Sequence, residues 1–359
     1  MDPLLGLSMR QGGVFTRQQA LMAGLSEQEI RKNSRVDGPW VVVRRGVFTE
    51  RSLFEALDPY DGLMQLHDRA AHVLLQRPHL MTHDSAARAW RLPMLRPEDR
   101  LVHVTRFGVG GSRTTHGVKH HLTRVGLLGT STVDGMSVSG LARTALDVAR
   151  EHGWVTGAMA CDAARRRGTS EMDFVDQLAL MWCWPGVTQA RRAFEFSDAG
   201  AESGGETLLR VLLEGLRLGA EATTQFPVQA AGRLFWADLR VGRHLFEFDG
   251  FTKFQRPERG GTAQKAPEEV AWDEKRRQDV ICGEGFGMSR VTWPEFFGRA
   301  RQLAVRRLQG EFQTTVDRFG WDLTPAMAEF AASMARERAG RMRDRDLPLA
   351  SPLAVLRHM

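Results

Sequence analysis

The chain has 359 residues, more than the about 250–300 at which a single hydrophobic core stops growing, so we expect two or three domains. With 42% hydrophobic and 26% charged residues, the composition is typical of a soluble globular protein and excludes a disordered polyelectrolyte. The net charge of +6 favours a polyanionic partner such as nucleic acid. No apolar run is long enough to span a membrane, and the amino terminus lacks the features of a signal peptide. Three widely spaced cysteines with no C-x-x-C pair indicate a reducing, cytoplasmic setting.

Residues 1–57 predict a small helical unit followed by a hairpin. Thr16 and Ser26 are good N-caps for helices over 17–22 and 27–35. The β-rich stretch 40–48 turns at a glycine, as a wing does. A helix-turn-helix with a wing reads DNA, so we expect a basic DNA-binding face. Its candidate residues are Arg31, Lys32, Arg35, Arg44 and Arg45. The alternative is a protein-protein interaction module with a basic surface.

Residues 58–200 predict a mixed α/β middle region that serves as a packing scaffold. Its expected strands are 101–106 and 118–122, and its expected helices are 62–76, 83–90, 140–150 (capped by Ser139), 155–167 and 170–183. His116, His120 and His121 are histidines near one strand. Because adjacent strand residues point to opposite faces, we do not expect these three to bind a metal together.

Residues 201–300 predict an α-β-β-β-α-β order. A helix beginning near Glu206 precedes three β-type segments, and a second helix precedes a last strand. The segments are helix 206–216, strands 223–228, 233–241 and 244–249, helix 273–282 and strand 287–292. Residues 301–359 are expected to form a helical C-terminal extension.

Carboxylates gather in this third region. The strand period of two places Glu247 and Asp249 on one face, and a short hairpin brings Asp238 beside Glu247. Converging carboxylates are costly unless a cation neutralises them, and oxygen ligands suit Mg²⁺, with Mn²⁺ as an alternative. Such an ion activates water for phosphodiester cleavage, and Lys253 is placed to stabilise the reacting phosphate. The alternative is a set of ordinary solvated carboxylates.

A block of about a hundred residues resembles the very-short-patch-repair-like branch of the PD-(D/E)XK nucleases. The residues that carry this resemblance are Glu202-Ser-Gly-Gly-Glu206, Ala237-Asp-Leu239, Glu247-Phe-Asp-Gly250, Lys253, Glu274-Lys-Arg-Arg277, Asp279 and Arg290-Val-Thr-Trp293. The resemblance implies a restriction-endonuclease-like mixed sheet flanked by helices, with Asp238 and Glu247 as metal ligands and Glu206 as an additional helix carboxylate. Asp249 stands where the family has its lysine, and Lys253 resembles a displaced substitute.

The N-terminal and middle regions resemble AbiEi-type antitoxins. The matching stretches are Gly13-Val-Phe-Thr16 to Arg45-Gly-Val-Phe48, His83-Asp-Ser-Ala-Ala87 and Ser139-Gly-Leu-Ala-Arg-Thr-Ala-Leu-Asp147. The expected fold is therefore α/β and multidomain: a winged helix-turn-helix, a mixed α/β region and a nuclease-like domain. The leading hypothesis is a DNA-binding protein with a Mg²⁺-dependent endonuclease domain. The alternative is a non-catalytic, antitoxin-like transcriptional regulator of a type IV toxin-antitoxin or phage-defence system, which would have a toxin partner.

Overall fold

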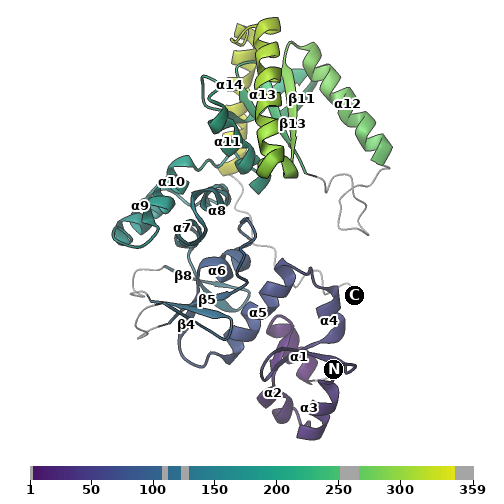
Figure 1. Ribbon diagram of the computed structural model, residues 1–359, viewed down its shortest axis with the longest axis vertical. Coiled ribbons are helices and arrows are strands. Elements are labelled where there is room, and N and C mark those ends of the chain that lie inside the picture. Colours follow the sequence, from purple (N-terminus) through teal and green to yellow (C-terminus); the bar gives the residue numbers. More distant parts are fainter. Residues whose placement is uncertain (1–2, 107–111, 123–128, 251–266, 344–359) are drawn as a thin grey trace. The chain divides into compact units, whose positions relative to one another are not determined.

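The described residues form a mixed α/β fold with three β-sheets, as seen in a computed structural model (Figure 1). The structure describes residues 3–106, 112–122, 129–250 and 267–343. The chain divides into two compact units, of which the first ends at Ser197 and the second begins at Asp198. Within the described residues, no helix combines the length and apolar character needed to cross a membrane.

The first unit begins with a small antiparallel sheet whose strand order is β1-β3-β2. Its strands are β1 (Val14–Thr16), β2 (Trp40–Arg44) and β3 (Val47–Glu50). The helices around it are α1 (Pro3–Arg10), α2 (Arg17–Met22), α3 (Glu27–Asn33) and α4 (Arg51–Ala56). Thr16 and Ser26 cap α2 and α3 with full capping boxes, which confirms both predicted helix starts. The rings of Phe15, Trp40 and Phe48 pack together beneath the helices. Neither α1 nor β1 was expected.

The rest of the first unit is a six-stranded mixed sheet covered by helices. The strand order is β6-β7-β5-β4-β9-β8, where the sequence predicted only two strands. The strands are β4 (His79–Met81), β5 (Val102–Arg106), β6 (Arg113–Thr115), β7 (Val118–His121), β8 (Thr130–Val133) and β9 (Met136–Ser139). The helices are α5 (Asp61–Leu74), α6 (His83–Trp90), α7 (Leu141–His152), α8 (Trp154–Arg166), α9 (Glu171–Leu180) and α10 (Val187–Phe196). Gly140, rather than the predicted Ser139, is the N-cap of α7, because Ser139 ends strand β9.

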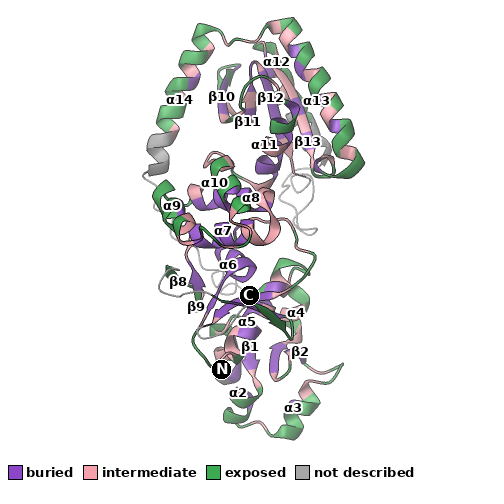
Figure 2. Ribbon diagram, turned by 60° about the vertical axis from the view of Figure 1, so that its left-hand side comes forward, coloured by how far each residue is buried: buried purple, intermediate pink, exposed green. Residues whose placement is uncertain are grey.

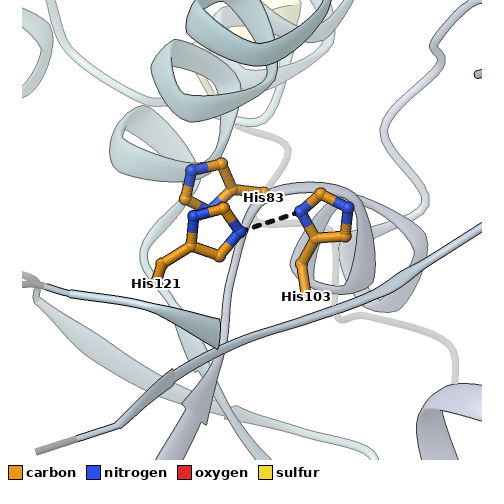
Figure 3. A group of neighbouring side chains, drawn as sticks. All are labelled: His83, His103 and His121. Atoms are coloured by element: carbon orange, nitrogen blue, oxygen red, sulfur yellow. Dashed lines mark hydrogen bonds between the residues drawn. The ribbon is translucent and has the colours of Figure 1, made fainter. Parts of the chain in front are cut away.

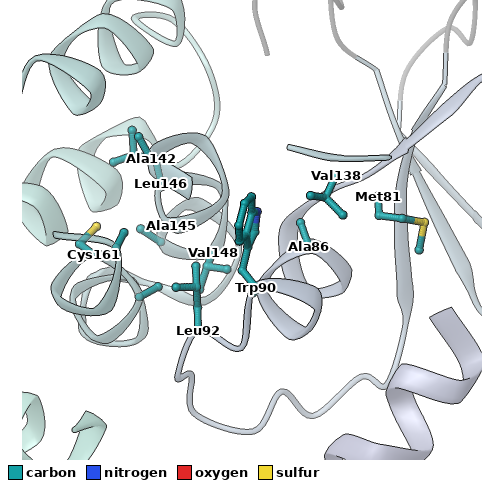
Figure 4. Close-up of a cluster of buried hydrophobic side chains, with 14 of the residues drawn as sticks. Met81, Ala86, Trp90, Leu92, Val138, Ala142, Ala145, Leu146, Val148 and Cys161 are labelled. Atoms are coloured by element: carbon teal, nitrogen blue, oxygen red, sulfur yellow. The ribbon is translucent and has the colours of Figure 1, made fainter. Parts of the chain in front are cut away.

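The main core of this unit lies between the sheet, α6 and the layer formed by α7 and α8 (Figure 4). Trp90 on α6 fills its centre, and its indole N–H donates to the carbonyl of Ser139 at 2.7 Å. Helices α7 and α8 approach so closely that a Cβ on Gly157 would lie 2.1 Å from the Cβ of Ala149. Small residues on both helices therefore set the spacing of this layer.

The second unit contains a four-stranded mixed sheet in the order β10-β11-β12-β13. Its strands are β10 (Thr223–Ala230), β11 (Arg233–Val241), β12 (His244–Asp249) and β13 (Gly287–Thr292). Its helices are α11 (Gly204–Leu216), α12 (Pro267–Gly283), the 3₁₀ helix η4 (Trp293–Phe296), α13 (Gly298–Phe319) and α14 (Pro325–Arg343). The first three strands are antiparallel neighbours, and β13 lies parallel to β12. The predicted α-β-β-β-α-β order of elements is thus observed.

The expected C-terminal extension is largely two helices of this second unit. Helix α13 packs against β13 and η4, and α14 packs against β10. Arg338 on α14 donates to the side-chain oxygen of Gln225 on β10 at 3.0 Å. Figure 2 shows that α13 and the coloured part of α14 are mostly exposed or half-buried, with few buried residues.

Candidate functional site

Asp238 lies where strands β11 and β12 stop pairing through their backbones. The antiparallel pairing runs from Val241 opposite His244 to Leu239 opposite Phe246. One step further along, the carboxylate of Asp238 accepts a hydrogen bond from the backbone N–H of Phe248 at 2.8 Å. The side chain thus replaces a main-chain acceptor at this opening of the sheet. This contact places Asp238 beside the Glu247–Phe248 segment, as the hairpin argument predicted.

Glu247 is held by two arginines. Its side chain is about nine-tenths buried, and its Oε1 accepts a hydrogen bond from Arg277 on α12 at 2.8 Å. Arg290 lies opposite Glu247 in the β12–β13 register, with its Nε 3.7 Å from Oε2. The negative charge of Glu247 is therefore compensated by cationic side chains of the chain itself.

Glu206 stabilises the start of helix α11. The N-cap Ser203 accepts from the backbone N–H of Glu206 and donates its hydroxyl to the carboxylate at 2.9 Å. The carboxylate also accepts from the backbone N–H of Glu202 at 2.7 Å and from Gln225 at 3.1 Å. These contacts are those of a helix cap, and they fix the Glu206 side chain in a buried position.

A glycine allows this helix start to lie directly on β12. A Cβ added to Gly205 would lie 2.1 Å from the ring of Phe248, so a larger residue has no room there. Gly205 therefore brings the helix that carries Glu206 against the strand that carries Glu247 and Asp249.

The predicted three-carboxylate ion site is not assembled as a close group in the described residues. Asp249 is half-buried at the end of β12. Asp238, Glu247 and Asp249 do not offer three ligand atoms within 4.8 Å of one another in the part of the chain that the structure describes. Lys253 lies outside the described residues. A shared metal ion at these side chains stays a prediction.

The predicted DNA-binding residues lie on α3 and on the β2–β3 hairpin. Arg31, Lys32 and Arg35 are exposed on and just after α3, and Arg45 is exposed in the hairpin turn. Arg44 differs, because its guanidinium donates to the backbone carbonyl of His116 at 2.9 Å. Burial lowers the pKa of Arg44, as expected for a guanidinium packed against protein.

A second constellation lies in the first unit, where three histidine rings meet (Figure 3). His83 begins α6, His103 lies on β5 and His121 lies on β7. Each offers one ring nitrogen within 4.8 Å of the other two, and all three residues are buried. His121 Nε2 and His103 Nδ1 form a hydrogen bond of 3.1 Å, and the rings of His83 and His121 stack with centroids 3.7 Å apart.

Two buried carboxylates border the histidines. Asp84 Oδ2 lies 3.7 Å from His103 Nε2, and Asp147 Oδ1 lies 3.8 Å from His83 Nε2. Burial lowers the pKa of His121 to about 4, and it holds the pKa of His83 well below its ordinary value. The rings are therefore neutral near pH 7 and retain a lone pair for an acceptor role.

The sequence pattern drew attention to His121 only together with His116 and His120, which lie outside this group. Strands β5 and β7 are parallel, with Thr105 opposite His121, so His103 and His121 lie two positions apart on one face of the sheet. His83 reaches them from α6. No local spacing signals this arrangement, because strand pairing and helix placement bring the three segments together.

Comparisons with known proteins assign no family to the chain. Neither the protein-family models nor the curated proteins include a match. The crystal structure of the RV2827C protein from Mycobacterium tuberculosis is similar at a TM-score of 0.36 and 16% identity. That similarity covers 64% of this chain and 88% of the other. A similarity of this degree supports no transfer of function.

Proposed function

We propose that the protein binds DNA and that its second unit is a Mg²⁺-dependent endonuclease, with Mn²⁺ as an alternative ion. The observation that carries the proposal is the place of Asp238 and Glu247. They lie on neighbouring strands of a mixed β10-β11-β12-β13 sheet, where the β11–β12 ladder opens. Helix α11, which carries Glu206, packs on β12, the strand that carries Glu247. The PD-(D/E)XK resemblance assigns the metal ligands to these positions.

The donor set suits a hard divalent cation. Asp238 and Glu247 would hold the ion, and Asp249 would assist from the end of β12, since carboxylate oxygens are the ligands that Mg²⁺ prefers. The ion would supply Lewis acidity at the phosphate and a bound water of lowered pKa. To bind the ion, Glu247 would give up the hydrogen bond that it accepts from Arg277. Lys253 is proposed to face the phosphate, and Glu206 to keep α11 in place.

The first unit supplies the proposed DNA contacts. Helices α2 and α3, joined by a turn at Gly24, precede the β2–β3 hairpin, which is the order of a helix-turn-helix with a wing. Exposed Arg31 and Lys32 on α3 are suited to base edges or phosphates, and Arg45 at the hairpin turn is suited to a phosphate.

A second candidate function is a non-catalytic, antitoxin-like transcriptional regulator that acts with a toxin partner. Two observations favour it. Arg277 and Arg290 already neutralise Glu247 without an ion. In addition, Asp249 stands at the position where the nuclease family has a lysine. In this function the second unit would serve as a scaffold.

Cleavage of supercoiled and nicked DNA by the full chain with Mg²⁺ or Mn²⁺ tests the proposal. We expect nicking that is lost in Asp238→Asn and Glu247→Gln. The matched control is Glu214→Gln, since Glu214 is an exposed carboxylate on α11 and should not affect cleavage. DNA binding without cleavage by the wild-type chain in either ion would favour the regulator. Cleavage that survives both substitutions would refute the site.

A further inference from the structure

We propose that His83, His103 and His121 form a binding site for a divalent transition metal of the Zn²⁺ class, separate from the carboxylates of the second unit. Three imidazole nitrogens are a ligand set that Zn²⁺ accepts readily and that Mg²⁺ disfavours. An ion bound there would cross-link three separate elements of the first unit, α6, β5 and β7 (Figure 3).

The distances between the rings are close to those of a metal centre. Tetrahedral Zn²⁺ with Zn–N bonds of about 2.0–2.1 Å places its ligand nitrogens roughly 3.3 Å apart. His103 Nδ1 and His121 Nε2 are 3.1 Å apart. The rings of His83 and His121 lie 12° from parallel, so ion binding requires a tilt of one ring to direct its lone pair at the shared ion. All three nitrogens already lie within 4.8 Å of each other.

The histidine cluster carries an unsatisfied group that an ion would use. His83 is 5% exposed, and its Nδ1 has no hydrogen-bond partner among the described residues. A buried polar atom without a partner is costly. His83 also has a left-handed backbone φ of 48°, which is strained for a residue with a side chain. Metal coordination would satisfy this nitrogen.

The surroundings resemble the outer sphere of a histidine metal site. Ligand histidines commonly direct their second nitrogen to a carboxylate, which fixes the tautomer. His103 Nε2 faces Asp84, and His83 Nε2 faces Asp147. Asp147 is itself held by Arg143 at 2.7 Å. His152 donates to Asp84 in turn at 2.7 Å, so both carboxylates are fixed.

Metal binding by the untagged full chain tests the proposal. After removal of metals with a chelator, we expect calorimetry to show one Zn²⁺ bound per chain. His121→Gln should weaken binding by about tenfold or more, since it removes a ligand. The control is His79→Gln, which breaks the His72–His79 pair, a contact of 2.8 Å that lies outside the three-histidine group. This variant should still bind one Zn²⁺ with wild-type affinity.

Co²⁺ in place of Zn²⁺ gives a second readout that needs no variant. The intense visible absorption of four-coordinate Co²⁺ should appear at one equivalent in the wild-type chain and disappear when Zn²⁺ is added. Mg²⁺ should not compete, which separates this site from the proposed nuclease site. The proposal is overturned if the stripped chain binds no Zn²⁺ and gives no such Co²⁺ spectrum. It is also overturned if folded His121→Gln protein binds Zn²⁺ as tightly as the wild type.

Discussion

Replacing Glu247 by glutamine should destabilise the second unit, because the Glu247 carboxylate compensates the charges of two arginines. If Glu247 were instead repelled by neighbouring carboxylates, the same substitution would stabilise the unit. Its carboxylate lies 2.8 Å from Arg277 and 3.7 Å from Arg290. Glutamine keeps the size of the side chain and one acceptor oxygen but removes the charge, so both guanidinium groups lose their ion pair with residue 247.

The expected loss lies between the values for buried and exposed ion pairs. Breaking a buried pair costs about 3–5 kcal/mol, and an exposed pair contributes about 0.2–1 kcal/mol. The Glu247 side chain is 10% exposed, but those of Arg277 and Arg290 are 26% and 24% exposed, so water can solvate the arginines partly. We therefore expect Glu247→Gln to lower the free energy of unfolding by about 2 kcal/mol in the absence of divalent ions.

Denaturant unfolding of the full chain, followed by a probe of the second unit, measures this loss. A double-mutant cycle with Arg277→Gln isolates the pair, and the coupling energy should exceed about 1 kcal/mol. Glu214→Gln on the exposed side of α11 is the control and should change stability by less than about 0.5 kcal/mol. Unchanged or increased stability of Glu247→Gln would show that the arginines do not compensate this carboxylate and would refute the reasoning.

Further predictions concern the helix contact, the histidines and the basic face. Gly205→Ala should lower the free energy of unfolding by about 1–3 kcal/mol, because the added Cβ would overlap the Phe248 ring. The control in the same helix is Gly215→Ala, whose Cβ would meet the end of an arginine at 3.7 Å. In the same unfolding assay this control should be neutral or stabilising. The pKa of His121 is lowered to about 4 in the folded chain, whereas an unfolded histidine has a pKa of 6.5. Between pH 6.5 and pH 4, His121 is therefore protonated in the unfolded chain but not in the folded chain. In the metal-free chain, stability should therefore fall as pH falls through 6.5, by up to roughly 3 kcal/mol at pH 4. An equally steep loss in the metal-free His121→Gln variant would contradict this. Arg45→Ala should reduce the salt dependence of DNA binding by about one unit per lost phosphate contact, while Arg44→Ala, whose guanidinium contacts the His116 carbonyl, should leave that slope unchanged.

Local sequence signals predicted the parts of the fold in which neighbouring residues decide the structure. The caps at Thr16 and Ser26 located α2 and α3, because capping depends on residues three positions apart. The alternation of apolar residues located β11 and β12, and the short connection through Gly242 implied their antiparallel pairing. Because a hairpin this short determines its own register, these signals were enough to predict that Asp238 lies beside β12.

The same signals could not reveal contacts made between distant segments. Strands β4, β6, β8 and β9 are three or four residues long, too short to show a period. The arginines on Glu247 come from α12 and from β13, and only the β12–β13 register brings Arg290 opposite the carboxylate. Arg44 has the residue type of a phosphate contact, and no local signal predicted that its guanidinium also donates to the carbonyl of His116 in the same unit.

The carboxylates of the second unit and the three histidines of the first unit differ in the partners that their buried polar groups already have. This difference affects how readily each group would bind an ion. In the second unit Asp238 has a backbone donor, Glu206 has its cap and Glu247 has its arginines, so an ion must compete with partners already in place. In the first unit His83 Nδ1 has no hydrogen-bond partner among the described residues, and an ion would displace a hydrogen bond between two imidazole rings, His121 and His103, rather than an ion pair. Metal affinity should therefore be higher at the histidines than at the carboxylates, where bound DNA phosphates would have to supply the remaining ligands for Mg²⁺.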